Sequence, residues 1–109
     1  DLDAQAELIR DDRVMITSKR WPNQAENLMI QKERREANLS RDPDLKIIAT
    51  ISSPVVRIYD DVAIADFVRR SDFIPGMGEM SPPTFTYITL VLVEEDGNWG
   101  IAHTHNSPM

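Results

Sequence analysis

Residues 84–107, TFTYITLVLVEEDGNWGIAHTHNS, carry the pattern that decides the fold of this chain. The first ten are rich in β-branched and aromatic side chains, which favour an extended strand. The acidic stretch that follows contains Asp96 and Gly97 and is typical of a hairpin turn. Residues 99–107 then return as a second strand. The stretch therefore predicts a long antiparallel hairpin.

Residues 45–73 continue the same period-two pattern on the N-terminal side of this hairpin. The stretch 45–61, LKIIATISSPVVRIYDD, predicts a long strand with a bulge or bend at Pro54. Its last residues, YDD, predict a tight turn into another strand, VAIADFVRRSDF, at 62–73. Three or four long antiparallel strands are therefore expected.

Two helices are expected before these strands. The spacing of Leu2, Ala6 and Ile9 indicates one stripe of a short helix. A first strand, with Val14 and Ile16 on the same side, should follow it.

The second helix has a recognisable start. Glu26 stands three residues after Asn23, which resembles a capped helix terminus, and the helix is expected to continue to about Leu39. Its apolar stripe is thin, so this helix should lie on the surface of another element. The stripe consists of Ala25, Leu28, Met29 and Leu39.

The length and the order of elements predict one domain, residues 1–109, of the α+β class. In this arrangement a curved antiparallel sheet has helices on one side. The chain has no cysteine, which excludes disulfides, thiol catalysis and cysteine-ligated zinc, and which fits a cytoplasmic location. A net charge of −6 argues against nucleic-acid binding. The longest apolar run, YITLVLV, is too short to span a membrane.

His103 and His105 are the two histidines of the chain. On a regular strand they share a face with Trp99 and Ile101, because alternate side chains point the same way. A metal site needs at least a third protein ligand, and no motif supplies one, so no metal or other cofactor is expected. A role as general acid or base stays open. Packing beside Trp99 is the simplest interpretation.

Arg69 closes a row of apolar positions on the strand at 62–73. Ala63, Ala65, Phe67 and Arg69 share one face. Three apolar residues that lead to an arginine indicate either a cavity wall with a polar end or an arginine that reaches a nearby acid.

The stretches DDVAIADFVRRSDF and YITLVLVEEDGNWGIAHTHNS resemble the SnoaL-like branch of the nuclear transport factor two-like superfamily. They are also similar to the association domain of calcium/calmodulin-dependent protein kinase. The resemblance covers roughly residues 1–107. It implies a cone-shaped α+β barrel, in which a bent antiparallel sheet wraps around N-terminal helices, and members are often dimeric through the sheet. The first helix of the fold is normally longer than the one expected here.

The resemblance also implies positions for a ligand site. The kinase association domain lines its pocket with arginines. Arg69 matches one of them, but the positions of two others hold the uncharged residues Leu90 and Asn106. By the same match Asn106 lies on the pocket face, and His103 lies on the outer face where sheets of this superfamily pair. The candidate ligand-binding residues are therefore Arg69, Phe67, Leu90 and Asn106, with His103 kept as a further candidate.

We expect a domain that binds a small organic molecule with one carboxylate or carbonyl group in a largely apolar pocket. Two alternatives stay open. One is an isomerase, dehydratase or cyclase with a His or Asp general base, although no catalytic residue is identified. The other is a non-catalytic dimerisation or assembly module. A homodimer is expected through the outer face, on which Val62, Ile64, Val68, Trp99 and Ile101 are placed.

Overall fold

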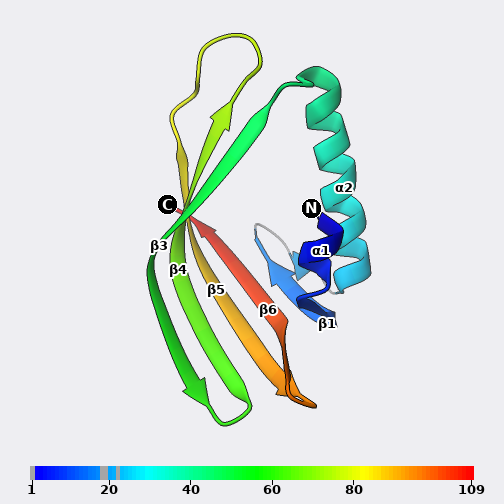
Figure 1. The fold of residues 1–109 in the computed structure, drawn as a ribbon, viewed down its shortest axis with the longest axis vertical. Helices are drawn as coiled ribbons and strands as arrows, with labels where there is room; N and C mark the ends of the chain where they lie inside the picture. The colour runs from blue at the N-terminus through cyan, green and yellow to red at the C-terminus, as the bar shows by residue number, and fades with distance from the viewer. Residues whose placement is uncertain (1, 18–19, 22) are drawn as a thin grey trace.

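A single curved sheet of six strands organises the structure, and two helices lie on one side of it (Figure 1). The computed structural model describes residues 2–17, 20–21 and 23–109. The elements in chain order are α1 (Leu2–Ala6), β1 (Ile9–Ile16), β2 (Arg20–Trp21), α2 (Gln24–Arg41), β3 (Lys46–Tyr59), β4 (Val62–Ile74), β5 (Thr84–Glu95) and β6 (Asn98–Pro108).

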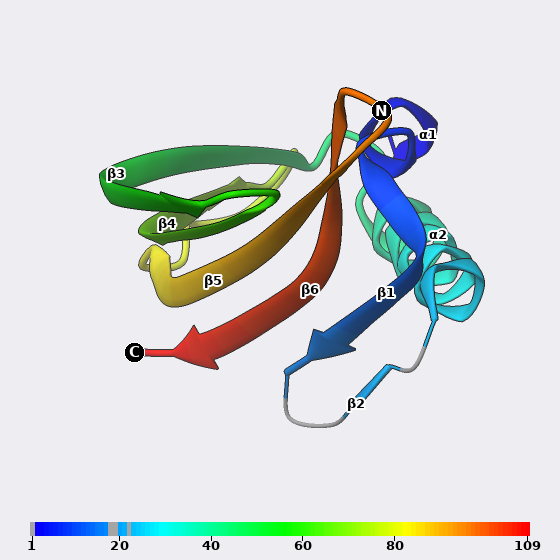
Figure 2. The same ribbon diagram turned by 90° about the horizontal axis from the view of Figure 1, so that it is seen from below.

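The strand order in the sheet is β2-β1-β6-β5-β4-β3. The strands from β3 to β6 form antiparallel hairpins, as predicted, whereas β1 runs parallel to β6. The α+β class with a curved sheet and N-terminal helices is therefore confirmed. The barrel is not closed, because β2 and β3 are the two edges of the sheet and do not pair with each other (Figure 2).

Two irregularities in the register shape the long strands. The predicted bulge near Pro54 is present: pairing between β3 and β4 shifts between Ser52 and Val55, and Ser53 has a φ of 54°. The second irregularity lies in β6, where Leu92 pairs with Ile101 but the preceding Val91 pairs with His103. One extra residue therefore sits in β6, and the strand changes the face of its side chains there.

Helix α2 begins where the sequence predicted. The side chain of Asn23 accepts a hydrogen bond from the backbone N–H of Glu26 at 3.0 Å, which caps the first turn. The buried residues of the helix, however, are Gln24 and Asn27. The predicted stripe of Ala25, Leu28, Met29 and Leu39 was wrong, since three of these four side chains are exposed and Leu28 is half-buried.

The cause of this difference is the position of α2 in the fold. Among the described strands, α2 makes its backbone contacts with β1 and β2, the last two strands at one edge of the sheet, and these strands set which of its side chains are buried. A thin apolar stripe contributes too little burial to impose a different rotation on the helix. The first helix also ends earlier than expected: the N–H of Leu8 bonds to the carbonyl of Gln5, and Ile9 already pairs with Ile101.

Polar side chains take an unusual share of the interior. The buried hydrophobic residues are Ala63 and Ile88. The buried polar residues are Arg13, Gln24, Asn27, Ser71 and Thr104. Apolar side chains normally dominate a core, so each of these buried polar groups needs a hydrogen-bond partner or another explanation. In the described ranges no helix has the length and apolar character that a membrane span needs.

Candidate functional site

One face of the sheet looks toward α2, and we call it the helix-side face. A cavity of about 560 Å³ lies between the helices and β3, and Ile47 and Ala49 of β3 line it together with Gln31 and Asn38 of α2. The strand register shows which residues of the other strands lie on this face, because directly paired residues point to the same side of a sheet. Ala49 pairs with Ser71, which therefore also lies on the helix-side face.

The structure brings four of the five predicted ligand-binding residues onto this face. Arg69 and Phe67 lie on it because they alternate with Ser71 along β4. Ile88 pairs with both Phe67 and Asn106, so Asn106 belongs to the same row. Leu90 follows two residues after Ile88 on β5. All four predicted residues are half-buried.

His103 lies apart from this group. It pairs with Val91, which alternates with Leu90 and therefore points to the opposite, outer face. His105 pairs with Thr89 on that outer face as well. The structure thus places both histidines away from Arg69, and the predicted role of His103 in ligand binding stays a prediction.

The extra residue in β6 separates Trp99 and Ile101 from the histidines. Ile101 pairs with Leu92 and Trp99 with Glu94, so both lie on the helix-side face. The prediction that side chains alternate regularly through residues 99–105 was therefore wrong. The predicted placement of Trp99 and Ile101 on the outer face was wrong for the same reason. The outer face keeps Val62, Ile64 and Val68 of the apolar residues expected there.

Several buried polar atoms have no hydrogen-bond partner among the described residues. They are Nε and Nη2 of Arg13, Oε1 of Gln24, Nδ2 of Asn27, Nε of Arg69 and Oδ1 of Asn106. All belong to α2 or to the helix-side face of the sheet. A buried polar group without a partner costs about 1–3 kcal/mol, and more when it is charged. Native proteins rarely tolerate this, which makes the helix-side face and the buried side of α2 the candidate site.

Arg13 is the residue of this region that sequence reasoning missed. It lies on β1 with 5% of its surface exposed, next to Thr104 on β6. Strand alternation gave a weak signal, since Arg13 and Met15 fall on the side of β1 opposite Val14 and Ile16. A charged side chain is rarely buried, so the pattern alone favoured solvent.

The guanidinium of Arg13 has one hydrogen bond. Nη1 donates to Oγ1 of Thr104 at 3.2 Å. Burial lowers the pKa of Arg13 from its usual value, because the charged form loses its hydration. No carboxylate of the described residues lies within ion-pair distance of it.

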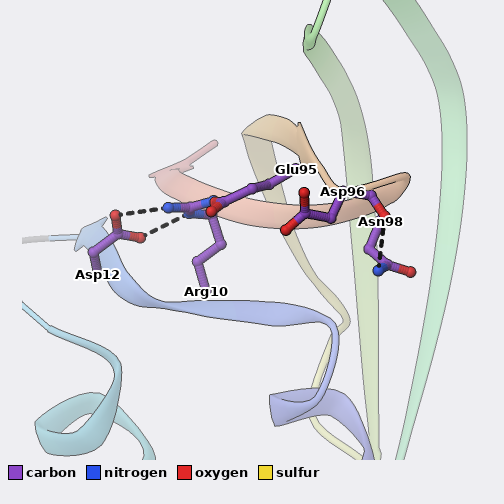
Figure 3. Close-up of polar contacts among 5 residues, drawn as sticks. All are labelled: Arg10, Asp12, Glu95, Asp96 and Asn98. Carbon is purple, nitrogen blue, oxygen red and sulfur yellow. Dashed lines mark hydrogen bonds and ion pairs between the residues drawn. The ribbon is translucent and has the colours of Figure 1, made fainter.

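Arg10, on the same strand, is fully paired (Figure 3). Its Nε and Nη2 donate to the two carboxylate oxygens of Asp12 at 3.0 and 3.2 Å, and its Nη1 donates to Glu95 at 2.7 Å. The hydrogen bond to Arg10 holds the pKa of Asp12 below its usual value. A Cβ on Gly100 would lie 2.8 Å from Cγ of Arg10, so glycine at this position leaves room for the arginine.

Arg70 is paired in the same way on the outer face. Its Nε and Nη2 donate to the carboxylate of Asp72 at 3.0 and 3.1 Å. Its guanidinium also lies 5.9 Å from the centre of the Phe85 ring. Arg69 and Arg70 are therefore neighbours in sequence with opposite environments, one with a buried Nε without a partner and one paired at the surface.

The 560 Å³ cavity is distinct from the predicted residues. Its lining is half apolar and half polar, and it includes none of Arg69, Phe67, Leu90 or Asn106. The lining residues are Leu2, Gln5, Gln31, Arg34, Arg35, Asn38, Leu39, Leu45, Ile47 and Ala49. In residues 2–17, 20–21 and 23–109, no three His, Cys, Asp or Glu side chains gather as a metal site would require.

The sequence of the chain matches a known protein family along its whole length. The family described as the calcium/calmodulin dependent protein kinase II association domain matches residues 1–109. The chain belongs to this association-domain family. No curated protein matches the chain.

Solved structures with the same fold belong to proteins of different kinds. The CaMKII hub of S. rosetta superposes with a TM-score of 0.75 at 20% identity, covering 100% of this chain and 82% of the hub. The β subunit of benzoate 1,2-dioxygenase from Burkholderia mallei gives a TM-score of 0.78 at 18% identity, with 99% and 77% covered. An NTF2-like protein from Novosphingobium aromaticivorans gives 0.80 at 13% identity, with 99% and 69% covered.

These likenesses establish the fold alone, because the identities are low. The family match confirms the predicted resemblance to the association domain of calcium/calmodulin-dependent protein kinase, and the solved structures confirm the predicted nuclear transport factor two-like fold. The function has to be argued from the residues of this chain.

Proposed function

We propose that this domain binds a small organic acid on the helix-side face of its sheet, with Arg69 as the polar anchor. The observation that carries the proposal is the buried Nε of Arg69, which has no partner among the described residues. Asn106, on the same face, has a buried side-chain oxygen that also lacks a partner among the described residues; this oxygen accepts a hydrogen bond, so a donor group of the ligand would pair with it. Phe67 and Leu90 supply apolar surface beside them. An apolar body with one carboxylate satisfies Arg69 and this apolar surface, since a guanidinium binds carboxylates through parallel hydrogen bonds.

Binding is favoured over catalysis by the residues that share this face. A proton-transfer enzyme needs an imidazole or a carboxylate close to its ligand. The residues of β4, β5 and β6 on the helix-side face include one acid, Glu94, next to the hairpin turn, and no histidine. On these three strands the isomerase or dehydratase alternative therefore has no candidate base next to Arg69.

The experiment compares two neighbouring arginines. Benzoate is a suitable probe because it joins an apolar ring to one carboxylate. Arg69→Ala should weaken benzoate binding roughly ten- to a hundredfold in calorimetry, the usual effect of losing a charge-assisted hydrogen bond. Arg70→Ala is the matched control and should change the affinity very little, because Arg70 is paired with Asp72 on the outer face. The proposal fails if Arg70 proves to be the sensitive residue.

A second candidate function is self-association. Membership of the association-domain family and the likeness to a CaMKII hub support it. The outer face carries the apolar side chains of Val62, Ile64 and Val68, with no helix over it. Light scattering at micromolar concentration should give a dimer or a larger species, and Val68→Asp should reduce its mass. A monomer mass for the unmodified chain would rule this candidate out.

A further inference from the structure

The buried guanidinium of Arg13 presents a hydrogen-bonding edge that no described residue uses. Among the residues that the structure describes, Arg13 is the one buried residue with a charged side chain. Thr104 accepts from its Nη1, whereas its Nε and Nη2 are buried and unpartnered. An uncompensated buried charge loses its hydration and gains no attraction in return, which destabilises the fold.

The chemistry that fits this edge is visible elsewhere in the molecule. Arg10 binds both oxygens of Asp12 through Nε and Nη2, and Arg70 binds Asp72 through the same two nitrogens. These two nitrogens form one side of the planar guanidinium, and their spacing matches the two oxygens of a carboxylate. The unpartnered edge of Arg13 is the same edge.

Helix α2, which contacts β1, also carries buried polar side chains. Gln24 and Asn27 are its buried residues, with 7% and 3% of their surface exposed, and the helix approaches β1, where Arg13 is the buried residue. Nδ2 of Asn27 is a further buried donor without a partner. The side-chain oxygen of Asn27 is already engaged, because it accepts from Gln31 at 3.5 Å.

We propose that Arg13 binds the carboxylate group of a small organic acid between β1 and α2. The nearly complete burial of Arg13 excludes a protein surface as its partner, because only a small group can come to lie against the guanidinium. This site is argued independently of the proposed role of Arg69. Two strands separate β1 from β4 in the sheet, so the two backbones lie about 14 Å apart.

The first experiment observes Arg13 directly in the unmodified chain. The Nε–H resonance of Arg13 is followed by nuclear magnetic resonance while sodium formate, the smallest carboxylate, is added at constant ionic strength. A saturable shift that sodium chloride does not reproduce is expected. No shift, or an equal shift with chloride, overturns the proposal.

The second experiment uses Arg13→Met, which keeps an unbranched, flexible side chain and removes the charge. In chloride buffer its melting temperature should equal or exceed that of the unmodified chain, because an uncompensated buried charge is lost. Formate should raise the melting temperature of the unmodified chain but not that of Arg13→Met. A variant that is less stable in chloride, or still responsive to formate, counts against the proposal. If the variant does not fold, the resonance experiment decides.

Two control variants separate this site from other effects. Arg10→Met removes an arginine of the same strand that is paired with Asp12 and Glu95, and the variant should keep the response to formate. Arg69→Ala should also leave the Nε–H shift of Arg13 intact. If Arg69→Ala loses benzoate binding and the Nε–H of Arg13 still shifts with formate, the two sites are independent. If benzoate binding depends on Arg69 but the Nε–H of Arg13 does not shift in the unmodified chain, only the Arg13 site is overturned. If Arg13 shifts but Arg69→Ala binds benzoate normally, only the proposed function is overturned.

Discussion

Arg10 and Arg13 lie three residues apart on β1 and have opposite environments. Arg10 is paired through three nitrogens with the carboxylates of Asp12 and Glu95, which are largely exposed (Figure 3). Arg13 is buried and has one neutral partner, Thr104. A surface ion pair contributes little to stability because water and salt screen it. A buried charge with one hydrogen bond is costly, and this cost is the reason for the ligand proposed at Arg13.

The largest expected effect comes from removing the single partner of Arg13. Thr104→Val keeps the shape of the side chain but deletes the hydroxyl, so Nη1 of the buried guanidinium loses the one hydrogen bond that Arg13 makes. We expect the free energy of unfolding, measured in urea, to fall by about 1–3 kcal/mol. Thr89→Val on the outer face is the control and should change it by less than about 0.5 kcal/mol.

The double variant sharpens this prediction. In Arg13→Met the hydroxyl of Thr104 no longer serves a buried charge, so Thr104→Val should cost much less in that background. A double-mutant cycle measures the difference as a coupling free energy between the two side chains. Equal costs in both backgrounds would show that Arg13 and Thr104 do not depend on each other.

An intermediate effect is expected at Gly100, next to Arg10. The new Cβ of Gly100→Ala would lie 2.8 Å from Cγ of Arg10, so the arginine must move and its pairs with Asp12 and Glu95 must weaken. We expect a loss of about 1 kcal/mol in the free energy of unfolding, at the low end for overpacking. In an Arg10→Ala background the same substitution should be almost neutral; a persistent loss would place the strain in the backbone instead.

The smallest effect is expected for Asp12→Asn, because the pair with Arg10 is exposed. The hydrogen bond from Arg10 lowers the pKa of Asp12 below 3.8, so its contribution to stability is present above that pH and is lost as the pH falls through the lowered pKa. The melting temperature of the variant should therefore lie slightly below that of the unmodified chain at neutral pH, and the difference should vanish in acid. A difference that persists in acid would exclude this ion pair as its source.

The long strands and the start of α2 could be predicted from the sequence, because the residues that determine them lie within each element or next to it. The bulge at Pro54 follows from the lost backbone donor of proline, and the helix start at Asn23 follows from a cap that acts within three residues. The shared face of Phe67 and Arg69 follows from alternation along an uninterrupted strand. These are local rules, and one sequence contains all the information they need.

The extra residue in β6 could not be read in this way. Nothing in the residues 99–105 distinguishes a regular strand from one that switches faces at Ala102. The switch is defined by pairing with β5, where Val91 and Leu92 meet residues that are two apart. Trp99 and Ile101 were therefore assigned to the wrong face, although His103 was placed correctly on the outer one by resemblance.

The sequence by itself determined the α+β class, the hairpins, the cap of α2 and the row that ends at Arg69, because period and turn chemistry act between near neighbours. Only the tertiary structure decided that the sheet stays open, that α2 turns Gln24 and Asn27 inward, and that Arg13 is buried. The physical reason is that burial depends on which elements meet. Arg10 and Arg13 are alike in sequence, and only the packing of α2 and β6 against β1 makes one a surface ion pair and the other a candidate binding site.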